Sequence, residues 1–264
     1  MNGCQKTPYR ETHGRVLREH FGLAPESGQY VIALAGNPNV GKSTVFNALT
    51  GLRQHTGNWP GKTVDNAQGT FIYRRKPFLL VDLPGTYSLL AHTGEEQIAR
   101  DFICFGEPNA TIVVLDATCL ERNLNLALQV MEITPRVIVC VNLMDEARKK
   151  EININFSALE YELGVPVVAT AARKGEGLAT LRETLYQVST GARQSNPRQL
   201  VYSPAVEEAI QRLLPNLQRL MDHKLNPRWV ALRLLDGDKT FIESIGRHLD
   251  LQSNWQAPQE AAAL

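Results

Sequence analysis

One short glycine-rich segment has the residue types and spacing that bind phosphate. Gly36-Asn-Pro-Asn-Val-Gly-Lys-Ser43, called the P-loop below, matches G-x-x-x-x-G-K-[ST] between an apolar run and a helical pattern. Backbone N–H groups of such a loop surround phosphate oxygens, Lys42 reaches the β- and γ-phosphates, and the Ser43 hydroxyl binds Mg²⁺. The pattern predicts a nucleoside triphosphate site formed by Asn37, Pro38, Asn39, Val40, Gly41, Lys42, Ser43 and Thr44.

A second segment bears on which base is bound. Asn142-Leu-Met-Asp145 follows a buried apolar run, and open α/β sheets bind ligands where their strands end. The Asp145 carboxylate can accept the N1–H and N2–H of guanine, a donor pair that adenine lacks, while Asn142 can brace the base and the P-loop. In isolation the pattern is more typical of a helix N-cap. After a P-loop it favours GTP over ATP.

Two further segments supply candidate residues for the metal and the γ-phosphate. Asp82-Leu-Pro-Gly85 ends another apolar run, so Asp82 can hold Mg²⁺ through water and the Gly85 N–H can contact the γ-phosphate. In isolation, the segment 82–85 would be read as an ordinary turn. Residues 56–63 are rich in Gly and Pro and are expected to close over Mg²⁺ and the γ-phosphate, with Thr63 as the switch threonine. The predicted Mg²⁺ residues are Ser43, Thr63 and Asp82.

Alternating strands and helices must position these residues. Short apolar runs separated by amphipathic stretches are typical of a parallel sheet covered on both faces. We therefore predict an α/β fold of the P-loop GTPase (Ras-like) type, with a mostly parallel, doubly wound sheet. Residues 65–73 are polar at first and are predicted to form a half-exposed edge strand. The other predicted strands are 30–35, 78–82, 110–115, 136–141 and 165–169, and the predicted helices are 42–50, 94–105, 121–132, 157–163 and 178–189.

The chain divides into four parts by composition. Residues 1–28 are polar and are predicted to be a flexible arm, followed by the α/β domain at 29–191. Residues 192–255 are predicted to form a small all-helical domain after a polar linker, and 256–264 a tail. The predicted helices of the second domain are 204–221, 228–235 and 239–249.

Charge and hydropathy exclude several partner classes. The formal net charge is +1, without the Lys/Arg blocks of a nucleic-acid or anionic-membrane surface, so no nucleic-acid partner is expected. The apolar runs are far shorter than the roughly 18 residues of a membrane span, and no secretion signal is evident. The cysteines Cys4, Cys104, Cys119 and Cys140 lack metal or redox spacing, so we expect a soluble, reduced, cytoplasmic protein.

Several segments resemble one family of GTPases. They resemble the cytosolic part of FeoB, the ferrous iron transport protein B, within the Era-like group. The resemblance implies a GTPase domain and a helical domain that favours GDP binding, attached in full-length FeoB to a membrane domain that moves Fe²⁺. It implies the cytoplasmic face of the bacterial inner membrane, with the membrane domain, small accessory Feo proteins and a homo-oligomer as candidate partners. The segments are GNPNVGKSTVFNALTG (36–51), GNWPGKTV (57–64), DLPGTYSL (82–89), EEQIARDF (95–102), NLMDEA (142–147), ARKGEGL (172–178), SPAVEEAI (203–210) and RWVALRLLDGD (228–238).

The resemblance also implies a potassium site and a slow reaction. Asn39 would help bind K⁺ beside the phosphates, with the carbonyls of Gly57 and Trp59 completing the site, and the cation would stabilise charge as an arginine finger does. Thr86 stands where Ras-like enzymes have a water-positioning Gln, so water positioning would fall to backbone groups and Thr63. Trp59 is expected to be exposed in a moving switch. The predicted catalytic residues are Thr63, Asn39 and Lys42.

Two positions depart from the family pattern. The loop Thr170-Ala-Ala-Arg173 offers no hydroxyl where the family often has Ser-Ala, which bears on GDP affinity. The cofactor-binding residues Ala171 and Ala172 are still expected there, with the N–H of Ala172 contacting guanine O6. Lys62 adds a charge to the switch segment.

Other functions fit parts of the pattern. The main alternative is a soluble Era-like GTPase acting in ribosome or tRNA maturation, whose second domain should then carry a basic face or a G-x-x-G loop. A nucleotide-gated interaction module with negligible hydrolysis is another, because no side-chain catalyst is evident. Metal sensing by Cys4, His13 and His20 is a third, with loose spacing.

Overall fold

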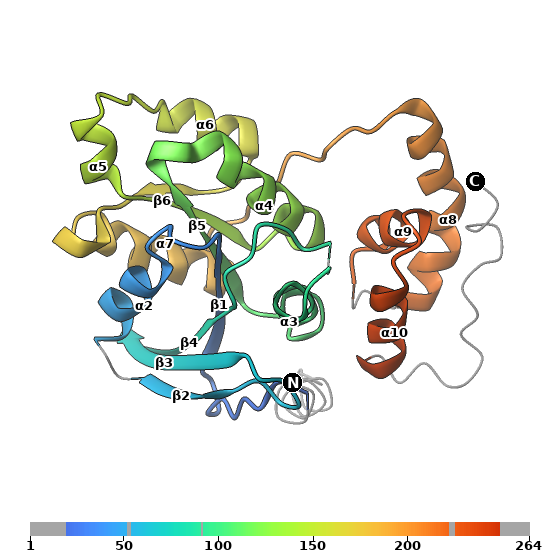
Figure 1. The fold of residues 1–264 in the computed structure, drawn as a ribbon, viewed down its shortest axis with the longest axis horizontal. Helices are drawn as coiled ribbons and strands as arrows, with labels where there is room; N and C mark the ends of the chain where they lie inside the picture. The colour runs from blue at the N-terminus through green and yellow to red at the C-terminus, as the bar shows by residue number, and fades with distance from the viewer. Residues whose placement is uncertain (1–19, 52–53, 91, 222–224, 249–264) are drawn as a thin grey trace, which may run out of the picture.

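In the computed structural model, which describes residues 20–51, 54–90, 92–221 and 225–248, one seven-stranded sheet organises the first domain (Figure 1). Its order is β2-β3-β4-β1-β5-β6-β7. Neighbours from β4 to β7 pair in parallel, whereas β2, β3 and β4 pair antiparallel. The strands are β1 (Tyr30–Gly36), β2 (Gln54–Asn58), β3 (Asp65–Tyr73), β4 (Lys76–Asp82), β5 (Ala110–Asp116), β6 (Val137–Asn142) and β7 (Val167–Ala169).

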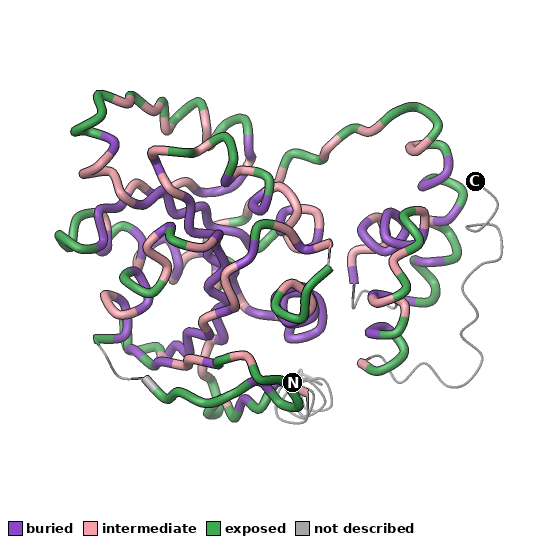
Figure 2. The backbone as a smooth tube through the Cα atoms, viewed as in Figure 1, coloured by how far each residue is buried: buried purple, intermediate pink, exposed green. Residues whose placement is uncertain are grey.

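Helices cover both faces of this sheet. α2 (Lys42–Thr50) and α7 (Leu178–Thr190) pack on one face. The opposite face carries α3 (Gly94–Phe105), α4 (Leu120–Ile133) and α6 (Phe156–Leu163), and the short α5 (Met144–Lys149) follows β6. The central strands are buried along their length because both faces are covered (Figure 2). The expected mostly parallel α/β architecture is confirmed.

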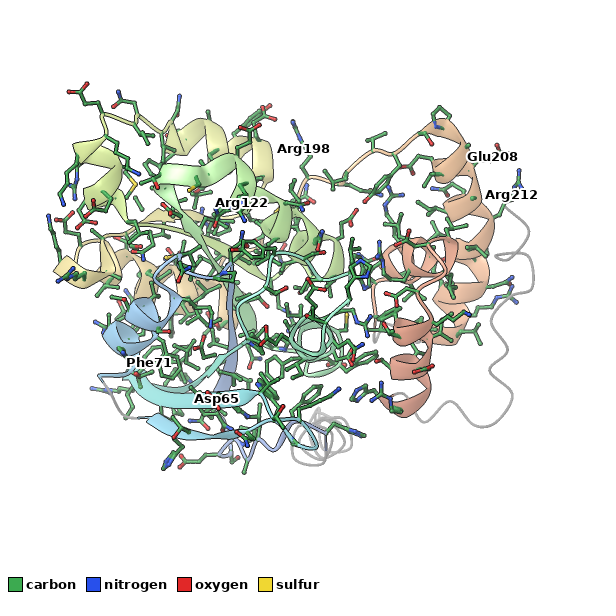
Figure 3. The ribbon with its side chains drawn as sticks, in the orientation of Figure 1. Asp65, Phe71, Arg122, Arg198, Glu208 and Arg212 are labelled. Carbon is green, nitrogen blue, oxygen red and sulfur yellow. The ribbon has the colours of Figure 1, made fainter. Side chains whose placement is uncertain are left out.

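A three-helix unit follows the linker. It consists of α8 (Pro204–Met221), α9 (Pro227–Leu235) and α10 (Lys239–His248), and α10 lies beside α3 (Figure 1). Its apolar side chains pack around Trp229, which is 1% exposed. Glu208 and Arg212 form an ion pair on the outer side of α8 (Figure 3). Charged residues thus lie on the outer face of an amphipathic helix, as the sequence pattern predicts.

Buried polar contacts join the two domains. Arg100 of α3 is fully buried and binds Asp101, Asp238, Thr240 and Ser244. Such a buried charge requires partners, because isolated burial of an ion is very unfavourable. The last helix is therefore held against α3 by specific hydrogen bonds as well as by apolar packing.

A second contact lies at the end of α4. The Tyr202 hydroxyl donates to the Glu132 carboxylate at 2.7 Å, and Asn226 Nδ2 donates to the Glu132 carbonyl at 2.7 Å. One residue of α4 therefore contacts both the linker before α8 and the start of α9.

Several expectations need correction. Residues 65–73 were expected to form an edge strand, but β2 pairs with β3 and is itself the edge. β2 and α5 were not predicted. The expected arm at 1–28 is not flexible throughout, because Phe21 and Leu23 are 4% and 0% exposed. Residues 1–19, the tail at 256–264 and the expected domain end at 255 lie outside the described residues.

Within the described part of the chain, no helix is both long and apolar enough to cross a bilayer. The longest, α8, alternates buried and exposed positions.

Candidate nucleotide-binding site

The P-loop joins the end of β1 to the start of α2. A Cβ on Gly36 would lie 2.8 Å from the Val114 carbonyl oxygen, and one on Gly41 would lie 2.5 Å from Asn142 Nδ2. Gly41 also has a φ of 80°. Both positions therefore require glycine, because a side chain would collide with neighbouring strands. The loop is held tightly against the carboxyl edge of the sheet, where it can surround phosphate oxygens.

Lys42 bridges the P-loop and the end of β4. Its Nζ donates to a carboxylate oxygen of Asp82 and, at 2.6 Å, to the carbonyl of Leu83. Burial raises the pKa of Asp82, while the Lys42 charge opposes this shift. Phosphate oxygens bound at the P-loop would compete with these acceptors for the ammonium group. Leu83 was not predicted as a site residue, since a backbone carbonyl leaves no signal in the sequence.

The segment after Asp82 lies directly against the P-loop. A Cβ on Gly85 would be 3.5 Å from Pro38, and the Thr86 N–H donates to the Gly36 carbonyl at 3.3 Å. The Thr86 side chain is buried, and its hydroxyl donates to the Ser88 carbonyl at 2.6 Å. Thr86 is therefore engaged in its own turn.

The exposure of the P-loop residues differs from position to position. Ser43 and Thr44 are exposed at the start of α2, and Asn39 is exposed with a φ of 68°. Asn37 is buried at 3% exposure, and its Oδ1 has no hydrogen-bond partner within the described part of the chain. The Ser43 hydroxyl and a single carboxylate, Asp82, suit Mg²⁺, which takes one or two carboxylates together with substrate phosphates.

Asn142 links the P-loop to the loop after β7. Its Nδ2 donates to the Val40 carbonyl at 3.0 Å, and its Oδ1 accepts from Thr170 Oγ1 and from the Ala172 N–H, both at 3.1 Å. The predicted bracing of the P-loop is thus present. The Ala172 N–H, expected to contact guanine O6, is here directed to Asn142 instead.

Asp145 lies at the start of α5, beside the same loop. Its carboxylate is 12% exposed and is 3.8 Å from Lys174 Nζ. Ala171 and Ala172 are buried, and the Met144 N–H donates to the Thr170 carbonyl at 3.1 Å. The structure therefore brings Asn142, Asp145 and the two alanines together at one edge of the sheet. Thr170 was not predicted as a site residue, although its place after β7 could have indicated it.

The switch segment forms a hairpin, called the switch hairpin below: β2, a loop at 59–64, and β3. Ala67 pairs with Asp82, so the loop lies at the same edge of the sheet as the P-loop. Figure 3 marks Asp65 at the start of β3. Thr63 is exposed in the loop. The expected flexible segment is therefore partly a β-strand.

The hairpin turns the predicted K⁺ carbonyls away from the P-loop. Gly57 stands opposite Asn66 in the β2–β3 register, two residues before Trp59, whose N–H donates to the Val64 carbonyl. Hydrogen-bonded pairs alternate along an antiparallel ladder, so Gly57 and Asn66 are again a hydrogen-bonded pair. The Gly57 carbonyl therefore faces β3. The Trp59 carbonyl accepts from the Lys62 N–H at 3.0 Å. In this conformation the residues do not fit a K⁺ site that also includes Asn39.

Trp59 is buried, which corrects the expectation of an exposed switch residue. Its side chain is 2% exposed and packs edge-on against Phe21 and Phe102, with ring centroids 6.3 and 5.7 Å apart. The Gly- and Pro-rich context indicated solvent exposure. The burial depends on aromatic residues far away in the sequence.

No separate metal centre is evident. Among the described residues, no group of three or more His, Cys, Asp or Glu side chains is arranged to hold a metal ion. Cys4 and His13, proposed with His20 as a metal-sensing set, lie outside the described residues.

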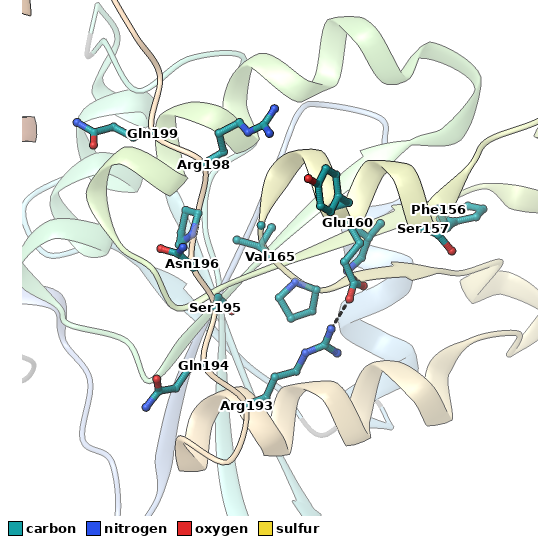
Figure 4. A pocket seen from close by; sticks show the side chains of 15 residues that line it. Phe156, Ser157, Glu160, Val165, Arg193, Gln194, Ser195, Asn196, Arg198 and Gln199 are labelled. Atoms are coloured by element: carbon teal, nitrogen blue, oxygen red, sulfur yellow. Dashed lines mark hydrogen bonds and ion pairs between the residues drawn. The ribbon is translucent and has the colours of Figure 1, made fainter.

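A large cavity elsewhere is distinct from the P-loop. It has a volume of about 1130 Å³ and lies between α6, residues 164–167 and the linker at 193–199 (Figure 4). The Arg193–Glu160 ion pair spans it, and the linker is anchored by the bond from the Asn196 N–H to the Gly164 carbonyl at 3.0 Å. Because none of the P-loop residues line it, we do not assign the nucleotide to this cavity.

Comparison with known proteins identifies both domains. The family model described as ferrous iron transport protein B matches residues 30–185, and the FeoB cytosolic helical domain model matches residues 202–263. The chain is 43% identical over 217 residues to the Fe(2+) transporter FeoB of Methanocaldococcus jannaschii, covering 82% of this chain and 32% of that protein. It is 37% identical over 228 residues to the Escherichia coli K12 transporter, covering 83% and 29%.

Solved structures give the same result. The cytosolic domain of T. maritima FeoB in a GDP form superposes with a TM-score of 0.75 at 36% identity, covering 89% of this chain and 90% of that one. The cytosolic domain of L. pneumophila FeoB gives a TM-score of 0.74 at 34% identity, covering 88% and 93%. The chain spans less than a third of the length of the curated relatives cited above. With its P-loop domain and its helical domain each matched, the chain belongs to the ferrous iron transport protein B (FeoB) family.

Proposed function

We propose that this chain binds GTP and hydrolyses it slowly to GDP and phosphate. The observation that carries the proposal is the Asn142 side chain, which joins the P-loop at Val40 to the loop of Ala172, beside Asp145. The P-loop, which would bind phosphate, and the Asp145 carboxylate, which would read guanine, thus lie at one edge of the sheet. The crystal structures of T. maritima FeoB in GDP and GMPPNP forms support a nucleotide site in this fold.

The chemistry would rest on positioning and charge stabilisation. A water oxygen attacks the γ-phosphorus, the bond to the β–γ bridging oxygen breaks, and the water's protons pass to phosphate oxygens and solvent. Lys42 and the P-loop N–H groups would hold the β- and γ-phosphates, and the Gly85 N–H would contact the γ-phosphate. Because the Thr86 hydroxyl donates to Ser88, it is not free to orient water, which supports a slow intrinsic rate.

Mg²⁺ would be held by Ser43 directly and by Asp82 through water. When bound, it would neutralise charge that develops on the phosphate oxygens. Thr63 would join this shell only after the switch hairpin moves, because the threonine lies exposed in the loop at 59–64.

Potassium use is a separate proposal that requires the switch hairpin to open. β2 would leave β3 so that the carbonyls of Gly57 and Trp59 could turn toward Asn39. Turnover measured in KCl and in NaCl tests this point. A higher rate in KCl is expected, and equal rates would remove K⁺ from the proposal while leaving GTP hydrolysis intact.

In the whole protein, we propose that this chain regulates or drives Fe²⁺ uptake from the cytoplasmic face of the cell membrane. The support is that its relatives are named Fe(2+) transporters, of whose length the matched part covers 29% and 32%. A relative from Porphyromonas gingivalis, a Fe(2+) transport protein A/Fe(2+) transporter FeoB fusion protein, favours small accessory Feo proteins as partners. The family matches favour this function over a ribosome- or tRNA-associated GTPase.

The decisive test of the nucleotide site is binding and turnover of GTP against ATP, with Lys42→Ala as the variant. GTP should be bound and hydrolysed in preference to ATP, and Lys42→Ala should lose tight binding. Unchanged GTP affinity in Lys42→Ala would contradict the site assignment.

A further inference from the structure

The N-terminal residues 20–23, called the N-terminal clamp below, pack into the region between the two domains and the switch hairpin. Phe21 is 4% exposed, and its ring lies against Trp59 of the hairpin, Phe102 of α3 and His248 of α10. The ring centroids are 6.3, 5.1 and 5.5 Å away, respectively. One side chain therefore contacts three separate elements of the molecule.

The backbone of the clamp also touches the hairpin loop. Gly22 has a φ of 65°, and a Cβ built there would lie 3.2 Å from Pro60 Cγ. Leu23 is fully buried in the same core. Leu23 thus packs in the domain core, and Gly22 lies close to Pro60 in the loop that follows β2.

The buried position of Trp59 needs this packing. Its Nε1 is buried and has no hydrogen-bond partner among the residues that the structure describes. An unpaired buried donor is unfavourable relative to the same group in water. Apolar contacts must therefore offset that penalty to keep the Trp59 side chain in its buried position, and Phe21 and Phe102 provide such contacts.

Space for movement exists beside the same contact. A cavity of about 250 Å³ is lined by residues of the clamp, the hairpin, α3 and α10, among them His20, Trp59, Ile98 and His248. The indole of Trp59 thus borders an open pocket and is not packed against protein on every side.

We propose that the N-terminal clamp is an intramolecular inhibitor of the nucleotide cycle: by packing Phe21 against Trp59, it holds the switch hairpin paired and keeps the carbonyls of Gly57 and Trp59 away from the P-loop. The inhibitory effect rests on the proposed GTPase activity and on the proposed use of the Gly57 and Trp59 carbonyls for K⁺, whereas the clamp itself rests on neither. Opening requires Trp59 to leave Phe21 and Phe102, and helix α10 takes part because His248 stacks on Phe21.

The test follows Trp59 directly. In a Trp229→Phe/Trp255→Phe background, Trp59 is the sole tryptophan of the chain. Phe21→Ala should shift its emission to longer wavelength, raise acrylamide quenching several-fold and raise GTP turnover by roughly tenfold. Phe21→Leu should restore part of the quenching protection, because an apolar side chain fills part of the same space.

The control is Ile72→Ala, which truncates an exposed side chain (74% exposed) on β3 of the same hairpin and should change neither readout. A second variant that lacks residues 1–21, and so keeps the buried Leu23, guards against local misfolding in Phe21→Ala and should behave like it. Circular dichroism and binding of a fluorescent GDP analogue establish that each variant is folded.

The outcomes separate the two proposals. Folded Phe21→Ala with unchanged quenching of Trp59 overturns the clamp. Increased quenching with unchanged turnover overturns its inhibitory role. If the parent chain does not turn over GTP at all, the proposed function fails, while the quenching comparison still decides whether Phe21 holds the hairpin.

Discussion

Arg100 and Asp238 form an ion pair between the two domains, with Nη1 and Oδ2 3.2 Å apart. Arg100 is 0% exposed, and the Asp238 side chain is 8% exposed. Asp238 also accepts from the Phe241 N–H at 3.0 Å, so it caps the start of α10 while it binds α3. One carboxylate therefore sets both the start of the last helix and its attachment to the first domain.

We predict that Asp238→Asn destabilises the protein. Removing the carboxylate charge leaves Arg100 buried with weaker compensation, at a cost of about 2–4 kcal/mol in unfolding free energy. Urea unfolding measures it. Glu208→Gln is the control, because Glu208 pairs with Arg212 on the exposed side of α8 and its loss should cost no more than about 0.5 kcal/mol. Equal effects of both substitutions would contradict the buried network.

Asn142→Ala should weaken GTP and GDP binding alike. The amide makes three hydrogen bonds that hold the P-loop to the base-side loop, and losing them should reduce affinity by about 30- to 100-fold, or roughly 2–3 kcal/mol. Titration with a fluorescent GDP analogue measures the change. Thr190→Ala, which removes an exposed hydroxyl at the end of α7, should leave affinity unchanged. Wild-type affinity in Asn142→Ala would show that the link is dispensable.

Asp145→Asn should change base preference more than overall stability. Guanine presents an N2–H donor to the carboxylate, whereas xanthine presents a carbonyl oxygen at that position. The amide of Asn can donate to this oxygen, so the ratio of xanthosine to guanosine nucleotide affinity should rise by at least tenfold, worth about 1.4 kcal/mol. Competition binding tests it, and an unchanged ratio would place the base elsewhere.

Acid should loosen the contact between α10 and the N-terminal clamp, where His248 stacks on Phe21. Burial lowers the pKa of His248 to about 4 from 6.5, with additional effects of His20, Arg247 and Arg100. Because the folded state binds the proton less well than the unfolded state, stability is complete above about pH 6.5 and is lost as pH falls toward 4.

The measurement is Trp59 quenching and thermal unfolding between pH 7.5 and 5. His248→Phe should retain stacking on Phe21 and Phe105 while removing the part of the pH dependence due to this imidazole. Asp101 of α3 lines the same pocket as His248 and is bound to Arg100 and Ser244, contacts that His248→Phe leaves untouched. An identical pH profile in His248→Phe would exclude His248 as the cause.

Local pattern predicted most of the fold. The helix at 204–221 is found with the predicted bounds, because its apolar residues follow the helical period and a polar linker precedes it. β2 could not be predicted in this way, since Gln-His-Thr-Gly-Asn has no alternating apolar residues and becomes a strand only by pairing with β3. The short α5 gave too few residues for a periodic signal.

In the candidate site, too, local sequence predicts some features, whereas others form only through contacts between distant residues. The P-loop and Asn142 could be predicted because their spacing and their position after strands are both visible in the sequence. The burial of Trp59 depends on Phe21 and Phe102, which meet only in the folded chain. The hydrogen bond from the Ala172 N–H to Asn142 depends on the relative position of the end of β6 and the loop after β7. Residue types alone do not specify that position.

The docking of α10 on α3 has a thermodynamic consequence. Trp59 of the switch hairpin packs on Phe102 of α3. If nucleotide binding alters the hairpin and thereby the docking of α10 on α3, then by linkage the docking of the helical domain must alter nucleotide affinity by the same free energy. The three helices and the nucleotide would then act as reciprocal effectors. Any contact that displaces α10 would then change nucleotide affinity by the same free energy.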